Sequence, residues 1–176
     1  GIKQKLFEFA YDQKLQNLRS DNSYTHFLWD KLVFSKIKEK VGFDRLRIII
    51  TGSAPISGQV MEFLRIAFCC PVVEGYGQTE NAAAAFITHV EDATIGHVGH
   101  PVACNETVLF DVPDMDYLST DKFHGDGEDK MPCLGRGEIC LRGPNVFKGY
   151  YKDPVKTAET IDKHGWLHTG DVGIFT

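Results

Sequence analysis

Long apolar segments are absent from this sequence, which has no run approaching the roughly 20 apolar residues that a membrane-spanning helix needs. An excess of basic residues is absent as well: 19 lysines and arginines stand against 24 aspartates and glutamates, for a net charge of −5. Because proteins bind nucleic acid largely through cationic side chains, this balance gives no electrostatic case for such a partner. We therefore expect no membrane segment in these residues and no nucleic acid partner.

Cysteines arranged for disulfide bonds are lacking too. The five cysteines are odd in number, two of them are adjacent, and no C-x-x-C motif occurs. They are Cys69, Cys70, Cys104, Cys133 and Cys140. This pattern favours reduced thiols in a cytosolic compartment over a disulfide framework.

Histidine clusters with metal-ligand partners are not evident. His97 and His100 are three residues apart, and His164 and His168 are four apart, but neither pair has an adjacent cysteine or carboxylate ligand set. We interpret all four as solvent-exposed or core histidines. The acidic stretch at 126–129 lacks the remaining loop ligands of a calcium site.

Three common active-site motifs are missing from the chain. The phosphate-binding pattern G-x-x-x-x-G-K-[ST] does not occur, and Gly75 and Gly77 lack the third glycine of a dinucleotide fingerprint. The G-x-S-x-G elbow of hydrolases is absent as well. Any active site must therefore be recognised from other residues.

The first half of the chain has alternating helical and strand patterns. Apolar residues at helical spacing predict helices over 2–19 and 24–41, and a β-branched run predicts a buried strand at 46–50. A helix over 57–67, capped by its first serine, and a strand at 71–75 follow. This βαβ order implies parallel strands, and it places the loops TGSAP and GYGQTE at neighbouring carboxyl ends, where α/β sheets bind ligands.

The second half of the chain is richer in glycine and proline and predicts mostly short strands. These strands are expected at 106–112, 137–143 and 171–176, in an antiparallel or barrel-like arrangement. An Asp-Pro pair starts a short helix over 153–161. The segment 113–135 holds few apolar side chains and is interpreted as a mobile surface insertion.

These patterns predict an α/β fold in two parts. Residues 1–95 would form an αβ layered subdomain with parallel strands, and residues 96–176 a small β-barrel-like subdomain with the loop insertion at 113–135. The chain begins without Met inside a helical pattern and stops at a strand-like run. We therefore expect it to be a piece of a longer protein.

The stretch VVEGYGQTENAAAAF carries unusual chemistry for a loop. Gly75 and Gly77 allow a bound group to approach the backbone, and Tyr76 between them can offer its ring face to a planar ligand. Thr79 supplies a hydroxyl for an oxyanion, and Glu80 supplies a hard oxygen suited to Mg²⁺. Together these groups suit a nucleotide.

A purely structural role for the same stretch is an equal alternative on residue chemistry alone. It would be a tight strand-to-helix turn with Thr79 as N-cap, followed by alanines at a close-packed helix start. Further along, Asp171 lies between Gly170 and Val172. An aspartate in a glycine-flanked turn can accept two hydrogen bonds from a ribose diol, although a β-turn aspartate is the commoner case.

Four motifs in order, TGSAP, EGYGQTE, GRGEICLRGPNVFKGYY and HGWLHTGDVG, resemble the acyl-adenylate-forming superfamily. Within it the chain is most similar to the long-chain fatty acyl-CoA synthetases (long-chain-fatty-acid–CoA ligases), and the resemblance covers nearly all of residues 46–176. It implies an adenine and acyl-tunnel border at Gly52, Ser53, Ala54 and Pro55. It implies an adenine-holding segment at Glu74, Gly75, Tyr76 and Gly77, with the Tyr76 ring stacked on the base.

The resemblance also implies the catalytic residues and the reaction. Thr79 would contact the α-phosphate, Glu80 would hold Mg²⁺, and Asp171 would bind both ribose hydroxyls. A fatty acid and ATP would give acyl-AMP and pyrophosphate, and coenzyme A would then give acyl-CoA and AMP. The implied ligands are thus ATP or AMP, Mg²⁺, coenzyme A and a fatty acid.

Two alternatives stay open: an adenylate-forming ligase for another carboxylic acid, and a non-catalytic nucleotide-binding domain of the same fold. The family's phosphate loop and C-terminal lid are not among these 176 residues, so we expect the isolated chain to be soluble and inactive. The resemblance places the whole protein on the cytoplasmic face of an organelle membrane, either the endoplasmic reticulum, the mitochondrial outer membrane or the peroxisome.

Overall fold

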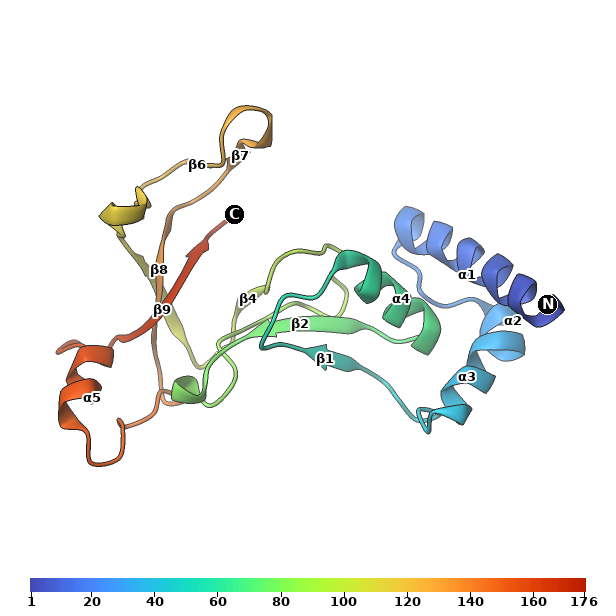
Figure 1. The fold of residues 1–176 in the computed structure, drawn as a ribbon, viewed down its shortest axis with the longest axis horizontal. Coiled ribbons are helices and arrows are strands. Elements are labelled where there is room, and N and C mark those ends of the chain that lie inside the picture. Colours follow the sequence, from blue (N-terminus) through green and yellow to red (C-terminus); the bar gives the residue numbers. More distant parts are fainter. The chain divides into compact units, whose positions relative to one another are not determined.

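The computed structural model describes all residues, 1–176, and divides into two compact units (Figure 1). The first unit comprises Gly1–Tyr76 and Phe86–His100. The second comprises Gly77–Ala85 and Pro101–Thr176. The chain therefore crosses between the units three times, after Tyr76, after Ala85 and after His100.

Helices form the beginning of the first unit, as the periodicity predicts. The predicted helix over 24–41 consists of three consecutive segments, of which the middle one is a π-helix. His26 caps the first of them, because its Nδ1 accepts hydrogen bonds from the backbone N–H of Leu28 and Trp29, both at 3.3 Å. The segments are α1 (Ile2–Asp21), α2 (Phe27–Trp29), η1 (Asp30–Phe34) and α3 (Ser35–Lys40).

The buried face of α1 is only partly the apolar set that marks it in the sequence. Ala10 and Leu18 are buried, but the side chains of Ile2 and Phe9 are 88% and 62% exposed. Lys14, a charged residue, is fully buried instead. The α1 face directed to the core thus includes a cation that the hydrophobic pattern does not reveal.

A predicted βαβ unit forms the rest of the first unit and is confirmed. Strands β1 and β2 are parallel, with Thr51 opposite Glu74, and α4 lies against β2 (Figure 1). Ser57 caps α4, because its Oγ accepts a hydrogen bond from Val60 N–H at 3.3 Å. The sheet has the order β1-β2-β3-β4. Its elements are β1 (Ile49–Thr51), α4 (Gly58–Phe68), β2 (Val72–Tyr76), β3 (Phe86–Ile87) and β4 (His100–Pro101).

The run of alanines does not begin a helix, so that interpretation is wrong. After β2 the chain makes one 3₁₀ turn, η2 (Thr79–Asn81), and then enters β3. Ala82 and Ala83 have φ angles of 55° and 74°, which are incompatible with a right-handed helix. The N-cap of the turn is Gln78 rather than Thr79.

The second unit contains an antiparallel sheet of three strands in the order β5-β8-β9. The sheet is open, and no closed barrel forms. Asp153 caps α5 as predicted, with its Oδ1 accepting from Lys156 N–H at 2.9 Å. The segment 113–135 contains two 3₁₀ turns and a short hairpin. The elements are β5 (Glu106–Phe110), η3 (Pro113–Met115), β6 (Phe123–His124), η4 (Gly127–Asp129), β7 (Met131–Pro132), β8 (Arg136–Arg142), α5 (Pro154–Thr160) and β9 (Leu167–Ile174).

Candidate functional site

In the first unit, the loop after β1 lies beside the end of β2. A Cβ atom added at Gly52 would lie 3.1 Å from the backbone oxygen of Gly75, so the two backbones are in close contact. The carboxylate of Glu74 is buried and accepts a hydrogen bond from the N–H of Ile56 at 3.3 Å. The predicted residues of this loop, Gly52, Ser53, Ala54 and Pro55, thus adjoin Glu74 and Gly75.

Tyr76 ends β2 and pairs with Phe86 of β3. Its ring is half-buried, and its centroid lies 6.0 Å from that of Phe86. The first unit therefore contains all the residues that the sequence assigns to the adenine except Gly77.

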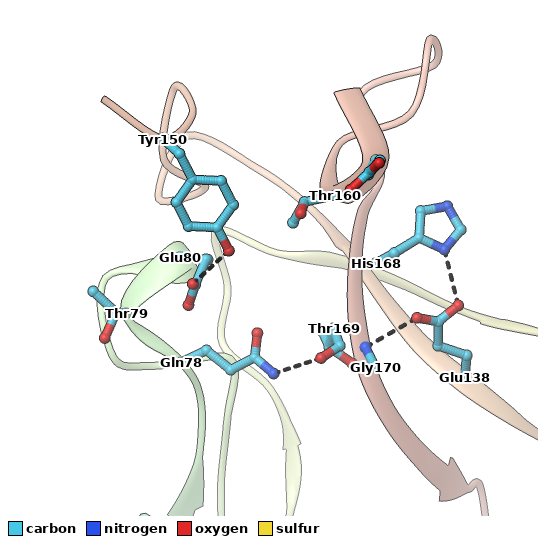
Figure 2. Close-up of a pocket in the computed structure, with 10 residues that line it drawn as sticks. Gln78, Thr79, Glu80, Glu138, Tyr150, Thr160, His168, Thr169 and Gly170 are labelled. Atoms are coloured by element: carbon cyan, nitrogen blue, oxygen red, sulfur yellow. Dashed lines mark hydrogen bonds and ion pairs between the residues drawn. The ribbon is translucent and has the colours of Figure 1, made fainter. Parts of the chain in front are cut away.

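In the second unit, a pocket of about 570 Å³ opens beside η2 (Figure 2). Its walls come from η2, from β8 and β9, and from the segment between Tyr150 and the end of α5. The lining residues are Gln78, Thr79, Glu80, Glu138, Tyr150, Glu159, Thr160, His168, Thr169 and Gly170. The two predicted catalytic residues, Thr79 and Glu80, thus face the same pocket.

The carboxylate of Glu80 is held in place by Tyr150. The Tyr150 hydroxyl donates a hydrogen bond to Glu80 Oε1 at 2.8 Å, as Figure 2 shows. This bond to a carboxylate, followed by desolvation, raises the pKa of the Tyr150 phenol above its ordinary value of 10.0. The backbone oxygen of Glu80 also accepts from Phe147 N–H at 2.7 Å, so both ends of the residue are fixed.

Asp171 lies in a β-bulge, not in the turn that its flanking glycine predicts. Cys140 pairs with His168 and Glu138 pairs with Val172, so three residues of β9 stand opposite Ile139 alone. Gly170 within the bulge has a φ of 73°, a left-handed conformation that favours glycine. The bulge removes Asp171 from the ladder and leaves its side chain exposed to solvent.

Gln78 connects η2 to this bulge. Its amide Nε2 donates to Asp171 Oδ2 and to the backbone oxygen of Thr169, both at 2.9 Å. The structure thereby joins Asp171 to Gln78, the residue before Thr79 and Glu80, across 93 residues of sequence. Asp171 itself is not among the residues that line the pocket. Gln78, Tyr150 and Glu138 carry no sequence signal that marks them as site residues, although Gln78 lies within the EGYGQTE motif.

The electrostatics of the pocket favour a bound cation. Glu80, Glu138 and Glu159 line it, and no lysine or arginine does. A phosphate group would be repelled by these carboxylates unless a cation lay between them. Carboxylate and hydroxyl oxygens are the ligands that Mg²⁺ prefers, so the donors present fit that ion.

His168, which the sequence predicts to be a solvent-exposed or core histidine, is half-buried and has two neighbours of metal-ligand type. Its Nδ1 lies 2.8 Å from Glu138 Oε2 and 3.5 Å from Cys140 Sγ. Burial, reinforced by the negative charge of Glu138, raises the pKa of the Cys140 thiol to about 12. The two neighbours come from the adjacent strand, so spacing along the sequence does not reveal them.

The mixed α/β fold and the acidic, hydroxyl-lined pocket agree with a match to the family described as AMP-binding enzyme, which covers residues 8–151. The chain belongs to this family. Over 98% of this chain, the sequence is 49% identical to fatty acyl-CoA synthetase A of Dictyostelium discoideum. Over 99% of this chain, the sequence is 47% identical to the peroxisomal long chain acyl-CoA synthetase 7 of Arabidopsis thaliana.

The chain spans about a quarter of the curated relatives it matches, 24% of the first and 23% of the second. Among solved structures, it is similar to the A domain of a carboxylic acid reductase from Segniliparus rugosus, in complex with AMP and a carboxylic acid. The TM-score is 0.58 at 28% identity, covering 95% of this chain and 24% of that one.

Proposed function

We propose that this chain belongs to an AMP-forming long-chain fatty acid–CoA ligase. The whole enzyme joins a fatty acid to ATP, giving acyl-AMP and pyrophosphate, and then transfers the acyl group to coenzyme A with release of AMP. The relatives named as fatty acyl-CoA synthetases support this substrate class. The observation that carries the proposal is the Gln78 link, which joins the turn bearing Thr79 and Glu80 to the bulge bearing Asp171.

Each predicted residue receives a defined task in this proposal. Asp171, exposed and oriented by Gln78, accepts hydrogen bonds from both ribose hydroxyls. The exposed Thr79 hydroxyl donates to the α-phosphate. Gly52, Ser53, Ala54 and Pro55 border the adenine and the acyl chain, and Glu74, Gly75, Tyr76 and Gly77 hold the adenine, with the Tyr76 ring against its face.

Glu80 would hold Mg²⁺, with Tyr150 keeping its carboxylate oriented. When bound there, the ion would supply positive charge against the negative charge that accumulates at the α-phosphate. The protein contributes chiefly position: Thr79 and Glu80 both lie on the turn η2 and line one pocket. Because both ends of Glu80 are fixed, little reorganisation is needed when the nucleotide binds.

The proposal extends to the organisation and location of the whole protein. Residues 1–95 and 96–176 belong to an αβ subdomain and a β-rich subdomain of one adenylation domain, with an insertion at 113–135. We propose that the enzyme works at the cytoplasmic face of an organelle membrane (endoplasmic reticulum, mitochondrial outer membrane or peroxisome), because its acyl substrate partitions into lipid. No helix in these residues has the length and apolarity to cross a bilayer.

A ligase for another carboxylic acid is the second candidate. The similarity to the reductase domain with AMP and a carboxylic acid favours it, because that domain binds the same two kinds of ligand. Rates of acyl-CoA formation by the full-length protein with acids of increasing chain length separate the candidates. A preference for short or aromatic acids would favour the second, and no AMP formation with any acid would indicate a non-catalytic domain.

Replacing Asp171 by alanine in the full-length protein tests the nucleotide assignment. Two charged hydrogen bonds to the ribose would be lost, at roughly 1.5–3 kcal/mol, so we expect the KM for ATP to rise by about 10- to 150-fold. Steady-state kinetics with varied ATP measures this. Asp129→Ala, in the exposed turn η4, is the control and should leave the KM unchanged. An unchanged KM in Asp171→Ala removes this residue from the ribose role.

A further inference from the structure

One face of the β8–β9 pair carries three metal-ligating side chains of different chemistry. Glu138 and Cys140 are two residues apart on β8, so both point to the same face of the sheet. His168 of β9 is directly opposite Cys140 in the ladder. The carboxylate oxygen, sulfur and ring nitrogen of the three all lie within 4.8 Å of one another.

We propose that Glu138, Cys140 and His168 form a binding site for a thiophilic divalent cation of the zinc class. Thiolate, imidazole and carboxylate are the three ligand types that Zn²⁺ uses, whereas Mg²⁺ and Ca²⁺ select oxygen ligands. The site is therefore chemically distinct from the magnesium position proposed at Glu80.

The spacing of the donor atoms is close to that of a tetrahedral zinc site. Zinc bonds to sulfur and nitrogen place these two atoms about 3.5 Å apart, and bonds to nitrogen and oxygen place that pair about 3.4 Å apart. His168 Nδ1 lies 3.5 Å from Cys140 Sγ and 2.8 Å from Glu138 Oε2. The first distance needs no change, and the second must open by about 0.6 Å. That opening requires the Glu138 carboxylate to move while its Oε1 accepts from the N–H of Gly170 at 2.9 Å.

The imidazole of His168 is already oriented for metal binding. Its Nδ1 faces both other donors, and its Nε2 lies 3.9 Å from Asp162 Oδ2. Metal-bound histidines commonly donate a hydrogen bond from their second nitrogen to a carboxylate. Asp162 is the carboxylate in position for this role, although the pair would have to close by about 1 Å to form that bond. The ring is also stacked on Phe110, with centroids 5.3 Å apart and planes 12° apart.

The same geometry argues against a cysteine nucleophile. In a catalytic triad, the nucleophile and the carboxylate contact opposite nitrogens of the histidine. Here the thiol and Glu138 both face Nδ1, and Cys140 is fully buried. Because Cys140 and Glu138 both lie near the same nitrogen of His168, the three side chains can surround one ion.

The site also offers an entry path and a fourth coordination position. Glu138 and His168 line the pocket, so a cation and a water molecule can reach them from solvent (Figure 2). When the ion binds, the Cys140 thiol releases its proton to solvent and a metal–sulfur bond replaces the S–H bond. Three protein ligands and one water make an open site of the kind that exchanges its fourth ligand.

Titration of the purified, reduced protein with Co²⁺ and Zn²⁺ tests the proposal. Cobalt reports its own ligands, because a thiolate ligand adds a near-ultraviolet charge-transfer band and tetrahedral geometry gives intense visible bands. We expect both signals at one ion per chain, and their loss when Zn²⁺ is added. Excess Mg²⁺ should not displace the cobalt.

Variants assign the ligands. Cys140→Ala should abolish the charge-transfer band, and Glu138→Gln and His168→Asn should each weaken Zn²⁺ binding by a hundredfold or more. Asp162→Asn should retain the band and weaken binding about tenfold, because asparagine keeps an oxygen for the backbone N–H groups of His164 and Trp166 but removes the charge near His168. Cys104→Ser is the control, because that thiol is exposed and should not contribute. Circular dichroism verifies that each variant is folded.

Two outcomes would overturn the proposal. One is the absence of a charge-transfer band when cobalt is added to the folded wild-type protein. The other is a band that persists in Cys140→Ala but disappears in Cys104→Ser, which would assign the ion to a surface thiol.

Discussion

Lys14 illustrates at the scale of a residue how a charge can form part of a core. Its ammonium group is fully buried and lies 2.5 Å from Asp30 Oδ1, 2.9 Å from the backbone oxygen of Ile66 and 3.2 Å from Cys69 Sγ. It also lies 4.3 Å from the centre of the Phe34 ring. These contacts replace the water that the ammonium loses, so a lysine can occupy a position that the helical pattern assigns to apolar residues.

Removing this lysine should destabilise the protein strongly. Lys14→Ala leaves the Asp30 carboxylate without its cation and opens a cavity, so we expect the free energy of unfolding to fall by about 3 kcal/mol. Urea unfolding with an unchanged m-value measures this. Lys5→Ala, at an exposed position of the same helix, should change the free energy by less than about 0.5 kcal/mol. A loss below about 1 kcal/mol for Lys14→Ala would contradict this account.

Glycines at the scale of an element explain how η2 and the β9 bulge are shaped. A Cβ atom at Gly77 would lie 2.2 Å from the backbone oxygen of Ala83, because the turn folds back onto its own beginning. Gly170 is the opposite case: no atom lies within 4 Å of its Cβ position, but its φ of 73° is unfavourable for other residues. Gly77 is required because a side chain would clash with the backbone, and Gly170 is favoured because its backbone is left-handed.

These two glycines should therefore differ in their response to the same substitution. Gly77→Ala forces backbone to move, so we expect a loss of about 2 kcal/mol or more in the free energy of unfolding. Gly170→Ala requires only a left-handed alanine, at a cost of about 1 kcal/mol. Thermal or denaturant unfolding of the two variants gives the order. Equal stabilities, or the reverse order, would mean that the turn is less tightly packed than the structure indicates.

Electrostatics matter at the scale of the whole molecule, because the pocket beside η2 is lined by carboxylates without a lysine or arginine. A nucleotide triphosphate carries several negative charges, and Mg²⁺ at one carboxylate offsets only part of them. The reaction that we propose for the whole enzyme would therefore need cationic groups beyond the residues that line this pocket.

We expect the isolated chain to form no acyl-CoA from a fatty acid, ATP and coenzyme A. A thioester assay against a no-protein blank measures this. A full-length protein of the size of the relatives, assayed in parallel, is the positive control. Turnover by the isolated chain above the blank would show that these residues suffice for the reaction.

The sequence by itself determined the features that depend on neighbouring residues. Three such features are the helical periodicity, the Ser57 and Asp153 caps and the βαβ order. Each depends on contacts within a few residues or on a repeating pattern, so each can be predicted from the sequence. The motifs also placed Thr79, Glu80 and Asp171 in advance as candidates. The alanine run was wrongly predicted to start a helix, because its conformation depends on the contact between Gly77 and the backbone of Ala83.

Only the tertiary structure decided which side chains meet. The Gln78–Asp171 hydrogen bond, the Tyr150–Glu80 hydrogen bond and the burial of Lys14 join residues far apart in the chain. The cluster of Glu138, Cys140 and His168 depends on the register in which β8 and β9 pair, which the spacing of residues along the sequence does not reveal. The chemistry of each side chain follows from the sequence, but the distances between side chains of a site are set by how the strands pair.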